Sequence, residues 1–292
     1  MTSARAAILI SGLALVSHAS CNAVAQSRLS HGSTPPVLSL SFANNGQHVS
    51  AREGQQIEIS LGTVGPRQYG TPEISSASVR LMSTAQDWPP TPGGPAFVYI
   101  FEAVAEGETQ LRVPVINNDP ALYTNDITFT ITINVVAARG RRSTRHDLLT
   151  PDQANTAPWQ NAWTNLNNFA RQSFIPLLPR LTGVEVQLVL ANPGAGSAEV
   201  SMMVLNAAGA GVAYVFKTVT SANCEHVMFL LPHGGLPVIP GQVYSIVLSG
   251  GDNLFGWKYV VGGYGKGAAF FNNKPLLKGA HSTFLFRTFG AS

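Results

Sequence analysis

The segment Asp126–Val135 reads "DITFTITINV", and it shows most clearly how this chain folds. Apolar and polar residues alternate along it, which is the period of a strand that buries one face of a sheet. Its apolar positions are β-branched or aromatic, and such residues favour strands. The upstream runs "QQIEISL", "FVYIFEAV" and "TQLRVPVI" share this character, and the turn sequences "NNGQ", "AEGE" and "NNDP" flank them. This part of the chain therefore predicts a β-sandwich.

A second series of strand-like runs begins near Trp159 and continues to the C-terminus. It comprises "VEVQLVLAN", "EVSMMVLNA", "GVAYVFKTV", "EHVMFLL", "QVYSIVLSG", "LFGWKYV" and "STFLFRTF". Turns that contain glycine or proline separate most of these runs, and repeated strands at this spacing are typical of a sandwich or jelly roll. The segment "WQNAWTNLNNFARQ", residues 159–172, predicts either a short helix or an entry strand.

Composition and length support an all-β protein of two domains. Charged residues make up 11% of the 292 residues, against about 25% in average chains, which excludes a charged helical bundle and an acidic disordered chain. We predict an immunoglobulin-like sandwich at 37–137, a basic linker at 138–158 and a jelly-roll-like sandwich at 159–292. The linker holds Arg139, Arg141, Arg142 and Arg145. These arginines fit a solvated hinge best, and contact with phosphates or anionic lipopolysaccharide is the alternative.

The N-terminus predicts export. Arg5 precedes an apolar run of eleven residues, and Ala23-Val24-Ala25 provides the small residues of a signal-peptidase site. Residues 1–25 are therefore predicted to be a signal peptide, and residues 26–36 to be disordered. The run is shorter than the about 20 residues of a transmembrane helix, so we expect a soluble periplasmic or extracellular bacterial protein.

The two cysteines bear on how the chain is processed. An alternative hypothesis makes Cys21 a lipidated residue, but His18 stands where lipoprotein signals carry an apolar residue. Cys224 is left alone in either case, so no internal disulfide is expected.

The stretch Phe255–Lys274, "FGWKYVVGGYGKGAAFFNNK", is the main candidate for a binding site. Its "GGYGKG" lacks the first glycine and the Ser or Thr of a phosphate loop, and no helical pattern follows it, so a glycine-rich turn is favoured over a nucleotide site. Phe255, Trp257 and Tyr259 share one strand face, which is either core, the favoured alternative, or a surface that stacks on sugars. The candidate ligand contacts are Tyr264, Asn272 and Asn273, with Trp257 and Tyr259 as weaker ones.

Other chemistry receives little support from the sequence. Cys224 and His226 fall at i and i+2 of a predicted strand, without a third metal ligand nearby, so a buried thiol is favoured and no metal or cofactor is predicted. Asp252-Asn253 is a turn or, less favoured, part of a structural calcium site. No HExxH, GxSxG or paired-carboxylate signature is present. An enzyme would need a dispersed site, with His226, His233 or His281 beside an acid and a nucleophile.

Residues 50–134 resemble the immunoglobulin-like chagasin-type inhibitors of cysteine proteases. The similar segments are "REGQQIEISL", "GTVGPRQYGTP", "TPGGPAFVYIFEAVAEGETQL" and "DITFTITI". The inhibitory loop motifs of that family, Asn-Pro-Thr-Thr-Gly-aromatic and Arg-Pro-Trp, are replaced here by "GPRQYG" and "INNDPALY". The resemblance implies an inhibitory surface made by Arg67, Gln68, Tyr69, Gly93, Gly94, Asn117 and Asn118.

Residues 172–289 resemble β-sandwich accessory modules of secreted bacterial proteins. "QSFIPLLPRLTGVEVQLVLANPG", "VIPGQVYSIVLSGG" and "FGWKYVVGGYGKGAAFF" carry this resemblance, which implies adhesion, glycan binding or structural support. The sequence thus favours an exported, non-enzymatic protein whose second domain contacts a polysaccharide or a cell-surface protein, with no nucleic-acid partner. The alternatives are a cysteine-protease inhibitor acting through the first domain and an enzyme with a dispersed site.

Overall fold

Strands make up nearly all of the regular structure, as the alternating sequence predicts. The computed structural model describes residues 36–62, 67–87, 95–117, 128–138, 149–159, 162–166, 169–192, 196–276 and 281–292. The helical element within these residues is the short 3-10 helix η1 (Phe42–Asn44), which Ser41 caps. The all-β class is therefore confirmed. None of the helical structure in the described residues is long and apolar enough to cross a bilayer.

The first group of strands covers the region predicted to be immunoglobulin-like. Its members are β1 (Leu38–Ser41), β2 (His48–Arg52), β3 (Gln56–Gly62), β4 (Arg67–Tyr69), β5 (Glu73–Ile74), β6 (Val79–Gln86), β7 (Ala96–Ala103), β8 (Gly107–Val113), β9 (Val115–Asn117) and β10 (Phe129–Val136). One sheet has the order β2-β10-β8-β5, and β1-β3-β7-β6 follow one another in another sheet. Strand β10 comes from the "DITFTITINV" segment and buries Phe129, Ile131, Ile133 and Val135. We call this group the first sandwich.

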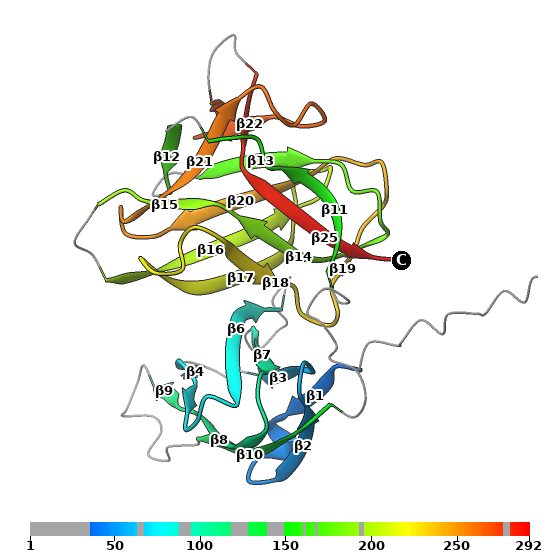
Figure 1. Ribbon diagram of the computed structural model, residues 1–292, viewed down its shortest axis with the longest axis vertical. Helices are drawn as coiled ribbons and strands as arrows, with labels where there is room; N and C mark the ends of the chain where they lie inside the picture. Colours follow the sequence, from blue (N-terminus) through cyan, green and yellow to red (C-terminus); the bar gives the residue numbers. More distant parts are fainter. Residues whose placement is uncertain are drawn as a thin grey trace, which may run out of the picture. The chain divides into compact units, whose positions relative to one another are not determined.

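The second group of strands reaches the C-terminus. Its members are β11 (Thr150–Asn155), β12 (Ala162–Asn165), β13 (Ala170–Phe174), β14 (Arg180–Val186), β15 (Leu188–Leu190), β16 (Ser197–Leu205), β17 (Gly211–Thr220), β18 (Val227–Leu230), β19 (Leu236–Pro237), β20 (Tyr244–Gly250), β21 (Phe255–Val261), β22 (Ala269–Phe271), β23 (Lys274–Pro275), β24 (Ser282–Phe284) and β25 (Phe286–Ala291). Strands β17-β16-β20-β13-β22-β23 form one layer, and β11-β25-β14-β18 and β12-β21-β15 form sheets over it (Figure 1). We call this group the second sandwich.

A single sheet continues from one sandwich into the other. Strand β6 pairs with β17 through three residue pairs, Tyr214 with Gln86, Val215 with Ala85 and Phe216 with Thr84. The resulting ten-stranded sheet runs from β1 to β23. The two faces of this sheet contribute to different hydrophobic cores. Phe97 and Tyr99 of β7 point into the first core, whereas Ala85 of β6 and Val98 of β7 join the core of the second sandwich.

Residues 34–292 form one compact unit, and the division into two domains stays a prediction. The predicted linker, 138–158, contains strand β11, which pairs with β25. Its four arginines lie outside the described residues, as do the predicted signal peptide and Cys21. The segment 159–172 forms strand β12 and the start of β13, so the entry-strand alternative is confirmed.

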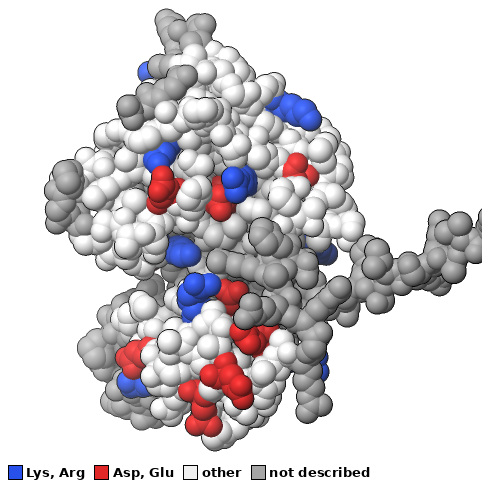
Figure 2. Space-filling view, in the orientation of Figure 1, with Lys and Arg blue, Asp and Glu red and all other residues white. Residues whose placement is uncertain are grey.

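Charge is unevenly distributed, as the sequence shows. Residues 37–136 hold four arginines against nine acidic residues, and residues 151–292 hold eight basic against five acidic ones. On the face drawn in Figure 2, acidic side chains gather over the first sandwich, while basic and acidic side chains lie next to each other over the second. The second sandwich therefore has no large surface of one sign on this face.

Candidate binding site

The inner face of β21 belongs to the core of the second sandwich. Phe255 and Trp257 are fully buried. The Trp257 indole stacks on Phe284, with ring centroids 4.2 Å apart, and its Nε1 donates to the Leu285 carbonyl over 2.9 Å. Tyr259, half-buried, meets the same Phe284 edge to face. The favoured alternative for this face is therefore confirmed, and Trp257 has no surface to offer a ligand.

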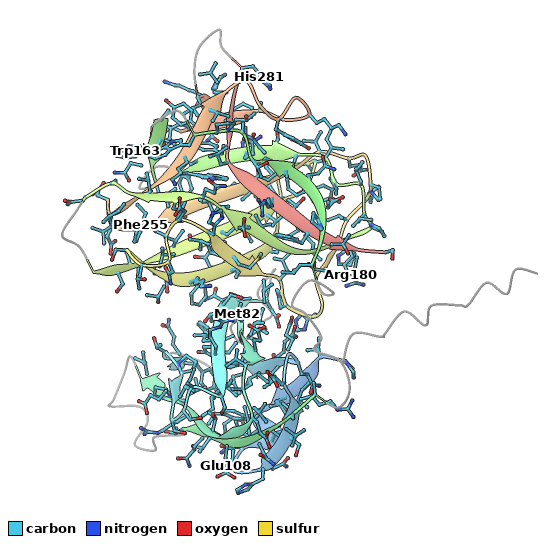
Figure 3. All side chains as sticks on the ribbon, in the orientation of Figure 1. Met82, Glu108, Trp163, Arg180, Phe255 and His281 are labelled. Atoms are coloured by element: carbon cyan, nitrogen blue, oxygen red, sulfur yellow. The ribbon has the colours of Figure 1, made fainter. Side chains whose placement is uncertain are left out.

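The outer face of β21 is covered by a tryptophan from another strand. Trp163 of β12 lies opposite Lys258 in the antiparallel register. Its indole extends over Gly256, because a Cβ at Gly256 would lie only 2.2 Å from Trp163 Cε3. Trp163 is nevertheless 40% exposed, so its indole rests on the strand and also meets solvent. Figure 3 labels Trp163 beside β12 and Phe255 near the start of β21.

A second tryptophan and an ion pair lie beside Trp163. The Lys258 ammonium is 4.5 Å from the centre of the Trp159 ring and 3.4 Å from Glu225 Oε1. The Lys258 side chain is only 8% exposed, whereas that of Glu225 is 74% exposed. The Trp159 indole nitrogen donates to the Ala162 carbonyl over 2.7 Å, which holds the ring in place. We define these five residues, Trp159, Trp163, Glu225, Gly256 and Lys258, as the Trp163 platform.

The Trp163 platform combines a flat apolar ring with hydrogen-bonding groups. An indole rests best against apolar C–H groups, and its exposed area is available for such a contact. The Glu225 carboxylate is an acceptor at the surface, and the Lys258 ammonium is a donor below it. A ligand with an apolar face and a polar rim fits this combination. The sequence analysis missed Trp163, because nothing local in residues 159–172 indicates which strand its ring covers.

Tyr264, one of the candidate ligand contacts, is buried. It is 8% exposed and packs edge to face on Phe286 at 5.2 Å. Its hydroxyl donates to Gln153 Oε1 over 3.0 Å and accepts from the Ile175 amide over 3.3 Å. The glycine loop permits this burial, because a Cβ at Gly267 would lie 2.0 Å from the Ser173 carbonyl oxygen. The ring and hydroxyl of Tyr264 are therefore used within the fold.

Asn272 and Asn273 form the turn between β22 and β23. Their φ angles are 50° and 59°, and Phe271 pairs with Lys274 across them. Asparagine tolerates positive φ better than most residues, so the pair suits a two-residue hairpin. Both residues are exposed, and no described contact joins them to Tyr264. The ligand site predicted for these three residues together is therefore not assembled.

Cys224 and His226 do not share a strand face, contrary to the sequence analysis. They precede β18 in irregular structure. Cys224 is a buried free thiol, which confirms the favoured alternative, and its Sγ lies 3.5 Å from the Ser221 carbonyl. His226 Nδ1 lies 3.3 Å from Glu185 Oε1. Within the described residues no three potential metal ligands gather. Asp252 and Asn253 occupy a turn, with φ angles of 44° and 62°.

The three histidines of the enzyme hypothesis lie in separate environments. His233 Nε2 is 3.2 Å from Asp87 Oδ1, and its Nδ1 is 3.5 Å from Glu58 Oε2. His281 Nε2 is 3.2 Å from the Tyr264 carbonyl, and His226 contacts Glu185. Among the described residues, none of these three histidines has a hydroxyl or thiol as its recorded hydrogen-bond partner.

The residues of the implied inhibitory surface are partly brought together. Strand β4 pairs with β9, which places Arg67 opposite Asn117 and Gln68 opposite Ile116. Gln68 and Tyr69 line a groove of about 980 Å³. Gly93, Gly94 and Asn118 lie outside the described residues. The backbone arrangement thus joins two of the three implied segments.

Comparisons with known proteins return structural matches at low identity. No family model matches the sequence, and no curated protein matches it. A cysteine protease inhibitor from Entamoeba histolytica, EhICP2, is similar over 34% of this chain and 95% of its own, with 11% identity and a TM-score of 0.28. Amebosin is similar over 35% of this chain and 100% of its own, with 23% identity and a TM-score of 0.25.

A third match concerns the class of carbohydrate-binding modules. A structure described as a module of the β-sandwich superfamily with promiscuous specificity is similar over 77% of this chain and 97% of its own, with 10% identity and a TM-score of 0.22. A protease inhibitor and a β-sandwich module were the two classes that the sequence resembled, so both resemblances recur among the structural matches. At these TM-scores the matches carry no argument about function.

Proposed function

We propose that this protein is an exported, non-enzymatic binding module that contacts a glycan through the Trp163 platform of the second sandwich. The observation that carries the proposal is the Trp163 indole, which lies over Gly256 and is 40% exposed. A sugar ring has an apolar C–H face and a rim of hydroxyl groups. The indole suits the face, and the exposed Glu225 carboxylate, held by Lys258, suits the rim.

The strand beneath the indole has a glycine where the ring lies, which supports a specific role for the position of Trp163. Gly256 is the second residue of strand β21 and pairs on both sides, with Asn165 and Val189. Glycine within a strand weakens it and often marks the close approach of another group. Here that group is the Trp163 ring, because any larger residue would collide with it. Export, predicted from residues 1–25, would expose the module to polysaccharides of a cell surface.

The test is a binding screen of the purified full chain against neutral and acidic polysaccharides and cell-wall polymers. We expect at least one polymer to bind, and Trp163→Ala to weaken that binding at least about tenfold. Phe169→Ala is the matched control, because Phe169 is another exposed aromatic residue of the second sandwich, at 62% exposure. A blank screen, or binding lost in Phe169→Ala and kept in Trp163→Ala, would reject the proposal.

A second candidate function is inhibition of a cysteine protease by the first sandwich. One observation favours it: β4 and β9 bring Arg67, Gln68, Tyr69 and Asn117 into one two-stranded ribbon. Titration of papain-like proteases with the full chain tests this function. Undiminished protease activity at micromolar protein would exclude it.

A further inference from the structure

A groove lies on the first sandwich and the adjoining strand β17. Its volume is about 980 Å³, at the upper end of the range for ligand pockets. Its lining residues come from the β4–β9 ribbon and from strands β6, β7 and β17, which are neighbours in one sheet and form the floor. None of the five residues of the Trp163 platform lines it.

The strand register arranges the floor of the groove in two rows. In one row Tyr99, Thr84 and Phe216 are neighbours on β7, β6 and β17, and in the other row Phe97, Gln86 and Tyr214 are. Residues directly opposite one another in antiparallel strands lie on the same face of the sheet. Each row therefore has a polar residue of β6 between two aromatic residues.

The four aromatic rings form a connected series from the core to the surface. Ring centroids are 6.4 Å apart between Tyr99 and Phe97, 6.4 Å between Phe97 and Phe216, and 6.1 Å between Phe216 and Tyr214. Tyr99 and Phe97 are 2% and 8% exposed, whereas Phe216 and Tyr214 are only half-buried.

The continuous sheet explains this series. One face of the sheet covers the core of the first sandwich. On β17 this same face points away from the second sandwich, because Val215, on the opposite face, is in the core of the second sandwich. Aromatic residues therefore continue from the first core into the groove. Gln86, half-buried between Phe97 and Tyr214, brings an amide that both donates and accepts hydrogen bonds.

The charged groups of the groove are largely matched within the protein. Arg80 donates to Glu102 over 2.6 Å, His226 is 3.3 Å from Glu185, and the Lys217 ammonium donates to the Met228 carbonyl over 3.4 Å. Burial, reinforced by Asp252, raises the pKa of the Glu199 carboxyl above its ordinary value. A neutral ligand would leave these contacts in place and needs no charged partner of its own.

We propose that this groove is a second binding site, which takes a neutral oligosaccharide with its sugar rings on Tyr214 and Phe216 and its hydroxyl groups on Gln86. The arrangement of rings beside an amide matches a ligand that alternates apolar faces with hydroxyl groups. An uncharged extended peptide is the competing occupant, and the test includes it.

The experiment is titration calorimetry of the full chain with short neutral oligosaccharides, acidic oligosaccharides and an uncharged peptide. We expect a neutral oligosaccharide to bind, and Tyr214→Ala and Gln86→Ala each to weaken it about tenfold or more. Tyr214→Phe keeps the ring and is expected to stay within about threefold of the wild type. Should Tyr214→Ala fail to fold, Gln86→Ala and Tyr214→Phe still give the answer.

The Trp163→Ala variant separates this inference from the proposed function. The inference predicts that Trp163→Ala leaves the groove ligand's affinity unchanged. If an oligosaccharide binds and only Trp163→Ala weakens it, the groove proposal is overturned and the proposed function stands. If only the peptide binds, or no oligosaccharide binds at all, the groove proposal is also overturned. Loss of binding only in the Gln86 and Tyr214 variants supports the groove, and the platform is then judged by the polysaccharide screen.

Discussion

Trp257 and Trp163 lie on opposite faces of strand β21 and have opposite environments. Trp257 is fully buried, stacked on Phe284 and hydrogen-bonded through its indole nitrogen. Trp163 comes from a different strand, lies over Gly256 and is 40% exposed. One tryptophan thus belongs to the core on one face of β21, and another tryptophan forms a candidate binding surface on the other face. The difference shows that alternation along a strand predicts which residues share a face. It does not predict which distant segment packs on that face.

The largest expected effect comes from truncation of the buried member of the pair. Trp257→Ala removes a fully buried indole together with its contacts to Phe284 and Leu285. We expect it to lower the free energy of unfolding by about 3–5 kcal/mol. Urea denaturation followed by circular dichroism measures this loss. A change below about 1 kcal/mol would show that Trp257 is not the core residue described above.

A smaller effect is expected from the glycine between the two tryptophans. Gly256→Ala places a methyl group 2.2 Å from the present position of Trp163 Cε3 and 3.0 Å from the Thr164 carbonyl, so the indole must move. We expect a loss of about 1–2 kcal/mol in stability and a loss of glycan affinity like that of Trp163→Ala. Unchanged tryptophan fluorescence and unchanged affinity in Gly256→Ala would contradict the ring's placement.

Truncation of the exposed member is expected to cost less stability than either change above. Trp163→Ala removes a ring that already meets solvent, so we expect a loss of about 1 kcal/mol. Thermal unfolding of Trp163→Ala beside Trp257→Ala measures the difference directly. Equal losses in the two variants would mean that Trp163 is a core residue as well.

The stability of the fold is expected to fall at alkaline pH because two tyrosines, Tyr99 and Tyr264, are buried. Burial raises the pKa of Tyr99 above its ordinary value of 10.0, and Tyr69 adds to the shift. Burial also raises the pKa of Tyr264 above 10.0, although the hydrogen bond from the Ile175 amide opposes this. The unfolded chain therefore loses these protons first. Their contribution to stability is complete below pH 10 and falls as pH rises through the higher folded values.

We expect this loss to reach about 1 kcal/mol per pH unit above pH 10 for Tyr99, and a loss of the same sign for Tyr264. Urea denaturation between pH 8 and 11 measures it, with Tyr99→Phe and Tyr264→Phe as variants that lack the titrating hydroxyl. A dependence on pH as steep in both variants as in the wild type would show that other groups cause the loss.

The sequence predicts the fold class well because most strands bury one face and therefore alternate. It predicts β10, β16, β17 and β20 from this period. It misses β11, because the inward side chains Gln153 and Asn155 are polar. It misses β6, because Met82, Ser83, Thr84 and Ala85 are all buried and the strand consequently lacks alternation. Strand β6 is also the one that joins the sheet to β17, so the groove could not be foreseen.

The candidate sites were less predictable than the fold. The sequence predicts a glycine-rich turn around Tyr264 and makes Tyr264 a candidate ligand contact. A glycine also permits close approach of the backbone, and Gly267 packs against the Ser173 carbonyl in this way. Trp163 and Gly256 are 93 positions apart in the numbering, and no local pattern links them. Contacts of this kind depend on strand pairing, and pairing between distant segments cannot be read from periodicity.

The central claim is that the exposed indole, and not the buried one, contacts the ligand. Calorimetric titration of the best-binding polysaccharide from the screen into the wild type, Trp163→Ala and Trp257→Phe tests it most directly. We expect Trp163→Ala to reduce affinity at least about tenfold. We expect Trp257→Phe to remain folded, which circular dichroism checks, and to keep its affinity. Equal affinity in the wild type and Trp163→Ala would contradict the account.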